Sequence, residues 1–344
     1  MKAMLLEKLG EMEPGTVPLT LRDVPEPRTG PGQVLLRVTA CGFCHTELDE
    51  IEGRTPPPRL PVIPGHQIVG RVVERGPGAG SLALDARVGV AWIFSACGEC
   101  AYCQSGRENL CASFQATGRD ADGGYAEYMV VSEDYATPIP DNLSDVEAAP
   151  LLCAGAVGYR SLRLANIAGS QALGLTGFGA SAHLVLQLAV WRYPGLRVYV
   201  FARSHAEQEF ARELGAAWAG DTLETPPELL DAVIDTTPAW LPVLEALRNL
   251  RPGGRLIINA IRKEDADRER LLELDYATHL WQEKEIKSVA NVTRADVREF
   301  LDLAAQIPLH PEIEIYPLGD ANQALWELKQ RKIRGAKVLR IEGG

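Results

Sequence analysis

Short apolar runs alternate with segments rich in glycine and proline over the first part of the chain. Residues 34–39, 68–73 and 87–92 alternate or cluster apolar side chains between turn signals, which predicts short strands. Residues 54–64 carry closely spaced prolines, which exclude a regular helix or a central strand. The pattern therefore predicts a β-rich domain over residues 1–150, with one stiff, irregular segment in it.

After about residue 150, apolar runs of strand length alternate with patterns of helical period. The predicted strands are residues 172–177, 196–202, 232–236 and 255–260, and the predicted helices are residues 182–191, 205–214 and 241–250. This alternation is typical of βαβ units and a parallel sheet. We therefore predict an α/β fold class with a doubly wound parallel sheet over residues 151–289.

The last segment, residues 290–344, mixes both kinds of element. Its pattern predicts helices at residues 295–306 and 320–329, an extended run near residues 313–317 and a closing strand at residues 336–341. A chain of 344 residues is long for a single core, which also favours two domains.

Charge and composition narrow the class of protein. The net charge of -11 argues against a nucleic-acid partner, although a local basic patch stays open. The sequence has no apolar run long enough to cross a bilayer, and its first residues turn polar too soon for a signal peptide. We therefore expect a cytoplasmic protein without a membrane partner. In that reducing compartment, seven cysteines indicate metal binding or catalysis before disulfides.

Four cysteines lie close together in a loop-like segment, with the spacing Cys97-x2-Cys100-x2-Cys103-x7-Cys111. Four such thiolates suit a closed, tetrahedral zinc site that stabilises the segment without doing chemistry. An iron–sulfur cluster is the alternative, because Cys-x2-Cys-x2-Cys also begins a ferredoxin pattern. The long fourth spacing, and Ala112 in place of a proline after it, favour structural zinc.

A glycine-rich segment, residues 177–182, follows a predicted strand and opens a predicted helix. It fits the pattern Gly-x-Gly-x-x-Gly/Ala, in which the first glycine makes a turn and the second lets the backbone approach a pyrophosphate. A plain tight turn is the alternative. Within βαβ units we predict a dinucleotide site that includes Gly177, Gly179, Ala180 and Ser181.

The predicted strand at residues 196–202 is not followed by the acidic residue that usually binds the ribose 2′-hydroxyl of NAD. Arg203 and Ser204 stand there instead. A guanidinium and a hydroxyl suit a 2′-phosphate, so the sequence favours NADP(H) over NAD(H). The alternative is that Arg203 is a solvated loop cation.

Cys44, His66 and Cys153 form a candidate catalytic metal set. A catalytic zinc keeps three protein ligands and leaves one position for water or substrate, and two cysteines with one histidine are one such set. Cys41 lies in a predicted buried turn, where a packing role suits it better.

These segments occur in the order found in the zinc-dependent medium-chain alcohol dehydrogenases, which the sequence resembles along essentially its whole length. The matching segments are residues 41–46, 64–66, 97–111, 153–155 and 177–179. The resemblance implies a GroES-like catalytic domain built from residues 1–150 and 290–344. It implies a Rossmann cofactor-binding domain between them, at residues 151–289.

The resemblance also implies roles for single residues. Cys44, His66 and Cys153 would bind the catalytic zinc, and the four clustered cysteines the structural zinc. Thr46 would bond the substrate oxygen and pass on its proton, although it could be only a turn hydroxyl. Glu47 would orient the zinc-binding histidine.

Three more positions match the family. His45 would lie near the cofactor phosphate, Arg294 would reach the cofactor, and Trp92 would line the substrate pocket. A polar turn residue and a core tryptophan remain the alternatives for His45 and Trp92.

Two of the positions that depart from the family pattern lie close in sequence to His66 and Thr46. Gln67 follows the zinc-binding histidine where relatives usually have glutamate, so it cannot offer a carboxylate to a displaced zinc. Asp49 stands where many relatives carry a histidine that ends the proton relay. The relay would therefore be shorter, end on an acid or lead directly to water.

The resemblance implies an enzyme, a zinc-containing alcohol dehydrogenase or aldehyde reductase that acts on primary or secondary alcohols and aldehydes. We expect it to prefer NADP(H) and to form a homodimer or homotetramer. A zinc polyol or sugar dehydrogenase of the same superfamily is one alternative. A non-catalytic nucleotide-binding relative is another, because a fold does not fix a function.

Overall fold

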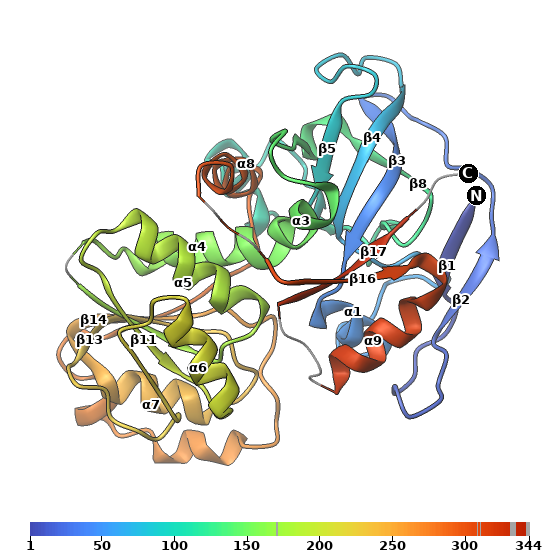
Figure 1. Ribbon diagram of the computed structural model, residues 1–344. Helices are drawn as coiled ribbons and strands as arrows, with labels where there is room; N and C mark the ends of the chain where they lie inside the picture. Colours follow the sequence, from blue (N-terminus) through green and yellow to red (C-terminus); the bar gives the residue numbers. More distant parts are fainter. Residues whose placement is uncertain (170, 308, 310, 331–334, 342–344) are drawn as a thin grey trace. The chain divides into compact units, whose positions relative to one another are not determined.

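The computed structural model describes residues 1–169, 171–307, 309, 311–330 and 335–341. The chain divides into two units (Figure 1). The first unit joins Met1–Ala156 to Val292–Gly344, and the second is Val157–Asn291. The predicted return segment, residues 290–344, includes residues 308, 310, 331–334 and 342–344, which lie outside the described part.

The first unit is rich in strands. Its strands are β1 (Lys2–Leu6), β2 (Leu19–Asp23), β3 (Gln33–Gly42), β4 (Gln67–Arg75), β5 (Arg87–Val90), β6 (Ile93–Ser95), β7 (Gln115–Ala116), β8 (Tyr128–Ser132), β9 (Ala136–Pro138), β16 (Ile313–Pro317) and β17 (Ala336–Arg340). Its α-helices are α1 (His45–Ile51), α2 (Ala101–Gln104), α3 (Asp145–Pro150), α8 (Arg294–Ala304) and α9 (Ala321–Lys329). Short 3₁₀ or π turns are η1 (Glu108–Leu110), η2 (Glu133–Tyr135), η3 (Leu151–Gly155) and η6 (Leu318–Asp320).

The central strand of this unit is β3. It pairs antiparallel with β4, β8 and β17, so the first and last parts of the chain share one sheet in the order β16-β17-β3-β4-β5-β9. Its side chains at Val34, Leu36 and Val38 are fully buried, as the alternating pattern predicts. The ends of β3 and β4 at Gly42 and Gln67 face each other in register, which brings the segments that follow β3 and precede β4 together.

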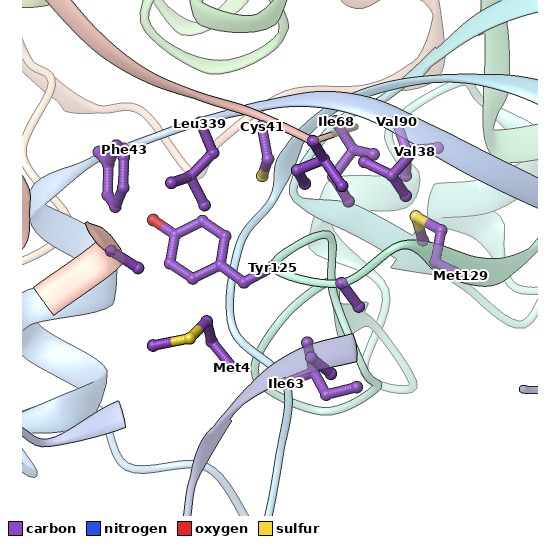
Figure 2. Close-up of a cluster of buried hydrophobic side chains, with 14 of the residues drawn as sticks. Met4, Val38, Cys41, Phe43, Ile63, Ile68, Val90, Tyr125, Met129 and Leu339 are labelled. Atoms are coloured by element: carbon purple, nitrogen blue, oxygen red, sulfur yellow. The ribbon is translucent and has the colours of Figure 1, made fainter. Parts of the chain in front are cut away.

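Tyr125 lies inside the core of this unit. Figure 2 shows its ring among Met4, Cys41, Phe43 and Leu339, which come from β1, β3, the segment after β3, and β17. The ring centroids of Phe43 and Tyr125 are 5.1 Å apart in a tilted arrangement. Cys41 is fully buried and belongs to β3, so the predicted turn at this position is wrong, because the strand continues to Gly42.

The second unit alternates strands and helices. Its strands are β10 (Ala172–Thr176), β11 (Arg197–Phe201), β12 (Trp218–Gly220), β13 (Leu230–Asp235), β14 (Leu250–Ile258) and β15 (Glu285–Ser288). Its α-helices are α4 (Ala156–Ala165), α5 (Ala180–Arg192), α6 (His205–Glu213) and α7 (Leu241–Asn249), and its short turns are η4 (Arg268–Glu273) and η5 (Tyr276–Leu280).

In the described part of this unit, six parallel strands form one sheet in the order β12-β11-β10-β13-β14-β15. This order is that of the Rossmann fold, with the switch point between β10 and β13. All five residues of β10 are buried, as expected for a central parallel strand covered on both faces. Figure 1 shows α5 and α7 on opposite sides of this sheet.

The predicted α/β class, with a β-rich part and a doubly wound parallel sheet, is confirmed. The pattern missed β12 and β15, because β12 has three residues and all four residues of β15 are exposed. Among the described residues, we find no helix with the length and apolarity needed to span a membrane.

Candidate active site

Cys44, His66 and Cys153 bring their ligand atoms together in the first unit. Two sulfurs and one imidazole nitrogen all lie within 4.8 Å of one another. Nε2 of His66 is buried and forms no well-oriented hydrogen bond within the described residues. This donor set, with one nitrogen left without a partner, fits a zinc ion that keeps one coordination position open.

Cys44 lies where β3 gives way to α1. It is the N-cap of α1, and its backbone N–H donates a 2.8 Å hydrogen bond to Oε2 of Glu47. A carboxylate in the first helical turn is favourable, because it satisfies a free backbone donor and complements the helix dipole. The helix therefore fixes the backbone of one candidate ligand.

The same carboxylate holds a second ligand. Oε1 of Glu47 lies 2.6 Å from Nδ1 of His66, and both side chains are essentially buried. Burial alone would lower the pKa of His66, but the charges of Glu47 and Cys44 raise it well above its usual value. Burial raises the pKa of Glu47, and the charge of His66 opposes that rise. Glu47 therefore directs Nε2 of the ring toward the two sulfurs.

Gly65 fixes the backbone beside His66. Its φ is +97°, and a Cβ placed there would lie 2.4 Å from Cδ1 of Tyr125 and 2.9 Å from Sγ of Cys41. No other residue fits this approach of backbone to core. The glycine before the histidine is therefore a packing requirement.

Cys153 lies on the π-helical turn η3, against which α8 packs. Such turns often occur at functional sites. The neighbouring Cys44 thiol raises the pKa of Cys153, and the Cys153 thiol is the largest cause that lowers the pKa of Cys44 well below its usual value. The two sulfurs are therefore close enough to influence each other's ionisation.

Thr46 and His45 begin α1. Oγ1 of Thr46 lies 3.5 Å from Sγ of Cys44, and the threonine is only 8% exposed. The predicted proton-handling hydroxyl thus borders the candidate metal set. His45 is exposed, so its predicted role near a phosphate stays a prediction.

The structure shows what surrounds Asp49 and Gln67, two positions that depart from the family pattern. Oδ1 of Asp49 lies 2.5 Å from Nε of Arg54, so the guanidinium engages this carboxylate. Gln67 is buried, and its side chain packs over Gly42, where a Cβ would lie 2.9 Å from Oε1 of Gln67.

Sequence reasoning missed Glu50, which lies on the same face of α1 as Glu47. It is 1% exposed, and in the described part of the chain neither carboxylate oxygen accepts a hydrogen bond. Burial, followed by the charge of Glu47, raises its pKa well above the usual value. The spacing of three residues from Glu47 is the signal that could have identified it, once a helix was predicted there.

Trp92 follows β5 and is half-buried. Its ring packs on Phe114, with centroids 5.1 Å apart. Its Nε1 has no hydrogen-bond partner among the described residues. These contacts leave both predicted roles, pocket wall and core tryptophan, as predictions.

The four clustered cysteines also converge. The sulfur pairs Cys97–Cys111, Cys100–Cys103 and Cys97–Cys103 are 3.5, 3.6 and 3.8 Å apart. Zinc–sulfur bonds of about 2.3 Å in a tetrahedron place the sulfurs roughly 3.8 Å apart. The spacing therefore fits one zinc ion, and in a four-iron cluster each thiolate would bind a separate iron. Backbone N–H groups of Glu99 and Cys100 lower the pKa of Cys97 to about 6.

In the second unit, the glycine-rich turn follows β10 at the switch point of the sheet. Gly177 has a φ of +77°, which favours glycine. A Cβ at Gly179 would have no atom within 4 Å, so the space above this backbone is open. Ala180 and Ser181 then begin α5. An open backbone at a helix N-terminus suits a pyrophosphate.

Arg203 and Ser204 follow β11 and are both exposed. Within the described residues Arg203 forms no ion pair, and the hydroxyl of Ser204 makes no capping bond to α6. Both side chains are thus available to a ligand at the carboxyl edge of the sheet.

Arg294 begins α8 in the first unit. Its backbone N–H donates a 2.8 Å hydrogen bond to Oε1 of Glu108, its Nε lies 3.3 Å from the same oxygen, and its guanidinium lies over the ring of Tyr135. Its predicted contact with a cofactor stays a prediction.

Comparisons with known proteins identify the family. Residues 30–141 match the family described as the alcohol dehydrogenase GroES-like domain. The chain is 43% identical over 346 residues to the "Probable alcohol dehydrogenase AdhA" of Mycobacterium tuberculosis (strain CDC 1551 / Oshkosh), covering 99% of this chain and 97% of the relative.

Solved structures with a similar fold are also dehydrogenases. A cinnamyl alcohol dehydrogenase of Sorghum bicolor is 25% identical, with a TM-score of 0.85 and coverage of 98% and 97% of the two chains. The "putative zinc-binding dehydrogenase" of Sinorhizobium meliloti 1021, solved bound to NADP, is 26% identical, with a TM-score of 0.84 and coverage of 98% of each chain. The chain therefore belongs to the zinc-dependent, NAD(P)-dependent alcohol dehydrogenases of the medium-chain dehydrogenase superfamily.

Proposed function

We propose that this enzyme interconverts primary or secondary alcohols with aldehydes or ketones, with a catalytic zinc on Cys44, His66 and Cys153 and with NADP(H) as its preferred cofactor. The observation that carries the proposal is the convergence of these three ligands within 4.8 Å. Thr46, beside them, supplies the hydroxyl that alcohol chemistry needs.

The chemistry divides between the bound groups and the protein. Zinc, when bound, is a Lewis acid that polarises a carbonyl or lowers the pKa of an alcohol, and the nicotinamide carries the hydride. Glu47 orients His66, Cys44 and Cys153 would bind zinc as thiolates, and the hydroxyl of Thr46 bonds the substrate oxygen and passes on its proton.

In the proposed mechanism, the proton that leaves Thr46 does not pass to Asp49. Support comes from Arg54, which engages the Asp49 carboxylate and holds it as an ion pair. A short route from Thr46 to water is therefore the proposed path.

The cofactor preference rests on the end of β11. The residue after the strand is the buried Ala202, and the next two are the exposed Arg203 and Ser204. A carboxylate there would repel a 2′-phosphate, whereas a guanidinium and a hydroxyl bind one. The relative from Sinorhizobium meliloti that is bound to NADP is consistent with this choice.

Kinetics with NADPH and NADH test the preference. We expect Arg203→Ala to raise KM for NADPH about tenfold or more and to leave KM for NADH nearly unchanged, because only NADPH carries the phosphate. Arg192→Ala, another exposed arginine of the same unit, is the control. A wild-type preference for NADH would reject the NADP assignment. Graded alcohols and aldehydes, with polyols alongside, would define the substrate class.

We also propose a second, structural zinc on Cys97, Cys100, Cys103 and Cys111, supported by their sulfur spacing.

The first unit would be the catalytic domain and the second the cofactor domain. A homodimer or homotetramer is proposed, since all residues of the edge strand β15 are exposed. The free cysteines among the described residues suit a reducing cytoplasm.

A further inference from the structure

A buried ion pair lies at the carboxyl edge of the parallel sheet, beside the glycine-rich turn. Asp235, the last residue of β13, is fully buried. It pairs with Nζ of Lys263, which follows β14 and whose side chain is 8% exposed. Burying two charges is costly unless hydrogen bonds satisfy both groups. Their remaining partners therefore show what the pair holds in place.

The carboxylate of Asp235 connects the end of β10 to the loop after β13. Its Oδ1 accepts hydrogen bonds from Oγ1 of Thr176 at 2.5 Å, from Oγ1 of Thr237 at 2.8 Å and from the Thr237 backbone N–H at 3.2 Å. Thr176 ends β10 and directly precedes Gly177. One side chain thus links the start of the glycine-rich turn to the loop after β13.

The ammonium of Lys263 ties the loop after β14 to the loop after β13. It donates to Asp235, to the carbonyl of Thr237 at 2.8 Å and to the carbonyl of Ala239 at 3.0 Å. An ammonium has three donors, and these contacts use all of them. Lys263 therefore holds loops and has no donor left for a phosphate group.

The loop after β13 bears directly on the glycine-rich turn. A Cβ at Gly177 would lie 3.0 Å from Oγ1 of Thr236 and 3.0 Å from Cγ2 of Thr237. Oγ1 of Thr236 in turn donates a 2.9 Å hydrogen bond to the carbonyl of Thr176. A shift of this loop would therefore move the wall of the turn that is expected to hold the pyrophosphate.

We propose that Asp235 and Lys263 are positioning residues for the dinucleotide, because they hold the loops after β13 and β14 against the glycine-rich turn. The inference rests on the proposed function, which places a nicotinamide dinucleotide at this edge. The pyrophosphate is common to NADP(H) and NAD(H). Loss of the pair therefore weakens both cofactors by the same factor, whereas loss of Arg203 changes their ratio.

The test is fluorescence titration of the zinc-loaded enzyme with NADPH and with NADH. Lys263→Met and Asp235→Asn should each raise both Kd values about tenfold and leave their ratio unchanged, since misplaced binding groups lose affinity. Lys337→Met is the matched control, a buried and ion-paired lysine of the other unit. It should leave both Kd values near those of the wild type.

A single substitution leaves one buried charge without its partner, so it can prevent folding. The double variant Asp235→Asn with Lys263→Met removes both charges. It should fold, bind both cofactors about tenfold more weakly, and show faster amide hydrogen exchange over residues 236–240 and 259–264. A folded double variant with both Kd values within about twofold of the wild type overturns the proposal, and so does a double variant that cannot fold.

These outcomes separate the two proposals. A wild type that binds NADH better than NADPH rejects the Arg203 assignment but leaves the test of Asp235 and Lys263 intact with NADH. A wild type that binds neither cofactor rejects both.

Discussion

Glu47 holds two candidate zinc ligands at once. Its Oε1 lies 2.6 Å from Nδ1 of His66, and its Oε2 accepts the backbone N–H of Cys44 at 2.8 Å. One buried carboxylate therefore couples the start of α1 to the residue that precedes β4. This coupling explains how segments that are distant in sequence meet with the accuracy that a metal site requires.

We predict that Glu47→Gln weakens catalytic zinc binding by about 10- to 100-fold, the usual effect of losing such an outer partner. The amide keeps the shape but removes the charge that orients His66. The measurement is competition with a chromogenic chelator. Glu52→Gln, on a buried carboxylate that pairs with Lys329 instead, is the control and should retain zinc. Equal zinc affinity in Glu47→Gln and the wild type would contradict this role.

Thr46 gives a test of the proton-handling hydroxyl. Thr46→Ala should lower kcat by about 10²- to 10⁴-fold, the usual range for general acid–base groups. Thr46→Ser keeps the hydroxyl and should recover most of the rate. Zinc content should stay unchanged in both, because Thr46 is not among the ligands that converge. Similar rates in the alanine and serine variants would show that the hydroxyl carries no proton.

The sequence could supply the ligand types and their order, but not α1. Ser, Thr, Asp and Asn are the usual N-cap residues, and here a cysteine takes that position, so the helix start at His45 had no ordinary signal. Without the helix, the shared face of Glu47 and Glu50 could not be inferred, nor could the pairing of Asp49 with Arg54.

The parallel sheet was easier to predict than its edge. β10 is apolar throughout because it is covered on both faces, whereas β15 has the sequence Glu-Ile-Lys-Ser and is exposed. The Asp235–Lys263 pair was also beyond the sequence. The pair and its partners come from the end of β10, from the end of β13 with the loop after it, and from the loop after β14, which only the strand order brings together.

A buried lysine in the first unit leads to a prediction about pH. Nζ of Lys337 donates to Oε2 of Glu327 at 2.7 Å and, as the largest cause, lowers the pKa of Glu327 from 4.5 to about 2. A depressed pKa contributes stability that is complete above the unfolded value of 4.5 and is lost as pH falls toward about 2.

Glu327→Gln should therefore destabilise the protein by about 1 kcal/mol at pH 6, an amount reduced by solvent screening, and by progressively less toward pH 3. Urea unfolding across this range measures the difference, with chelator present so that metal loss contributes equally. Glu26→Gln, at an exposed position, should show no such trend. A difference that stays constant with pH would rule out the ion pair as its cause.

Zinc analysis combined with turnover tests the central claim most directly. The wild type should contain one catalytic and one structural zinc per chain. Cys44→Ser should lose one zinc and its alcohol dehydrogenase activity. Cys97→Ser should also lose one zinc, but chiefly lower the melting temperature, because the four-cysteine site supplies stability and not chemistry. Undiminished turnover in Cys44→Ser, or an unchanged zinc content in that variant, would contradict the assignment of Cys44, His66 and Cys153 as the catalytic metal site.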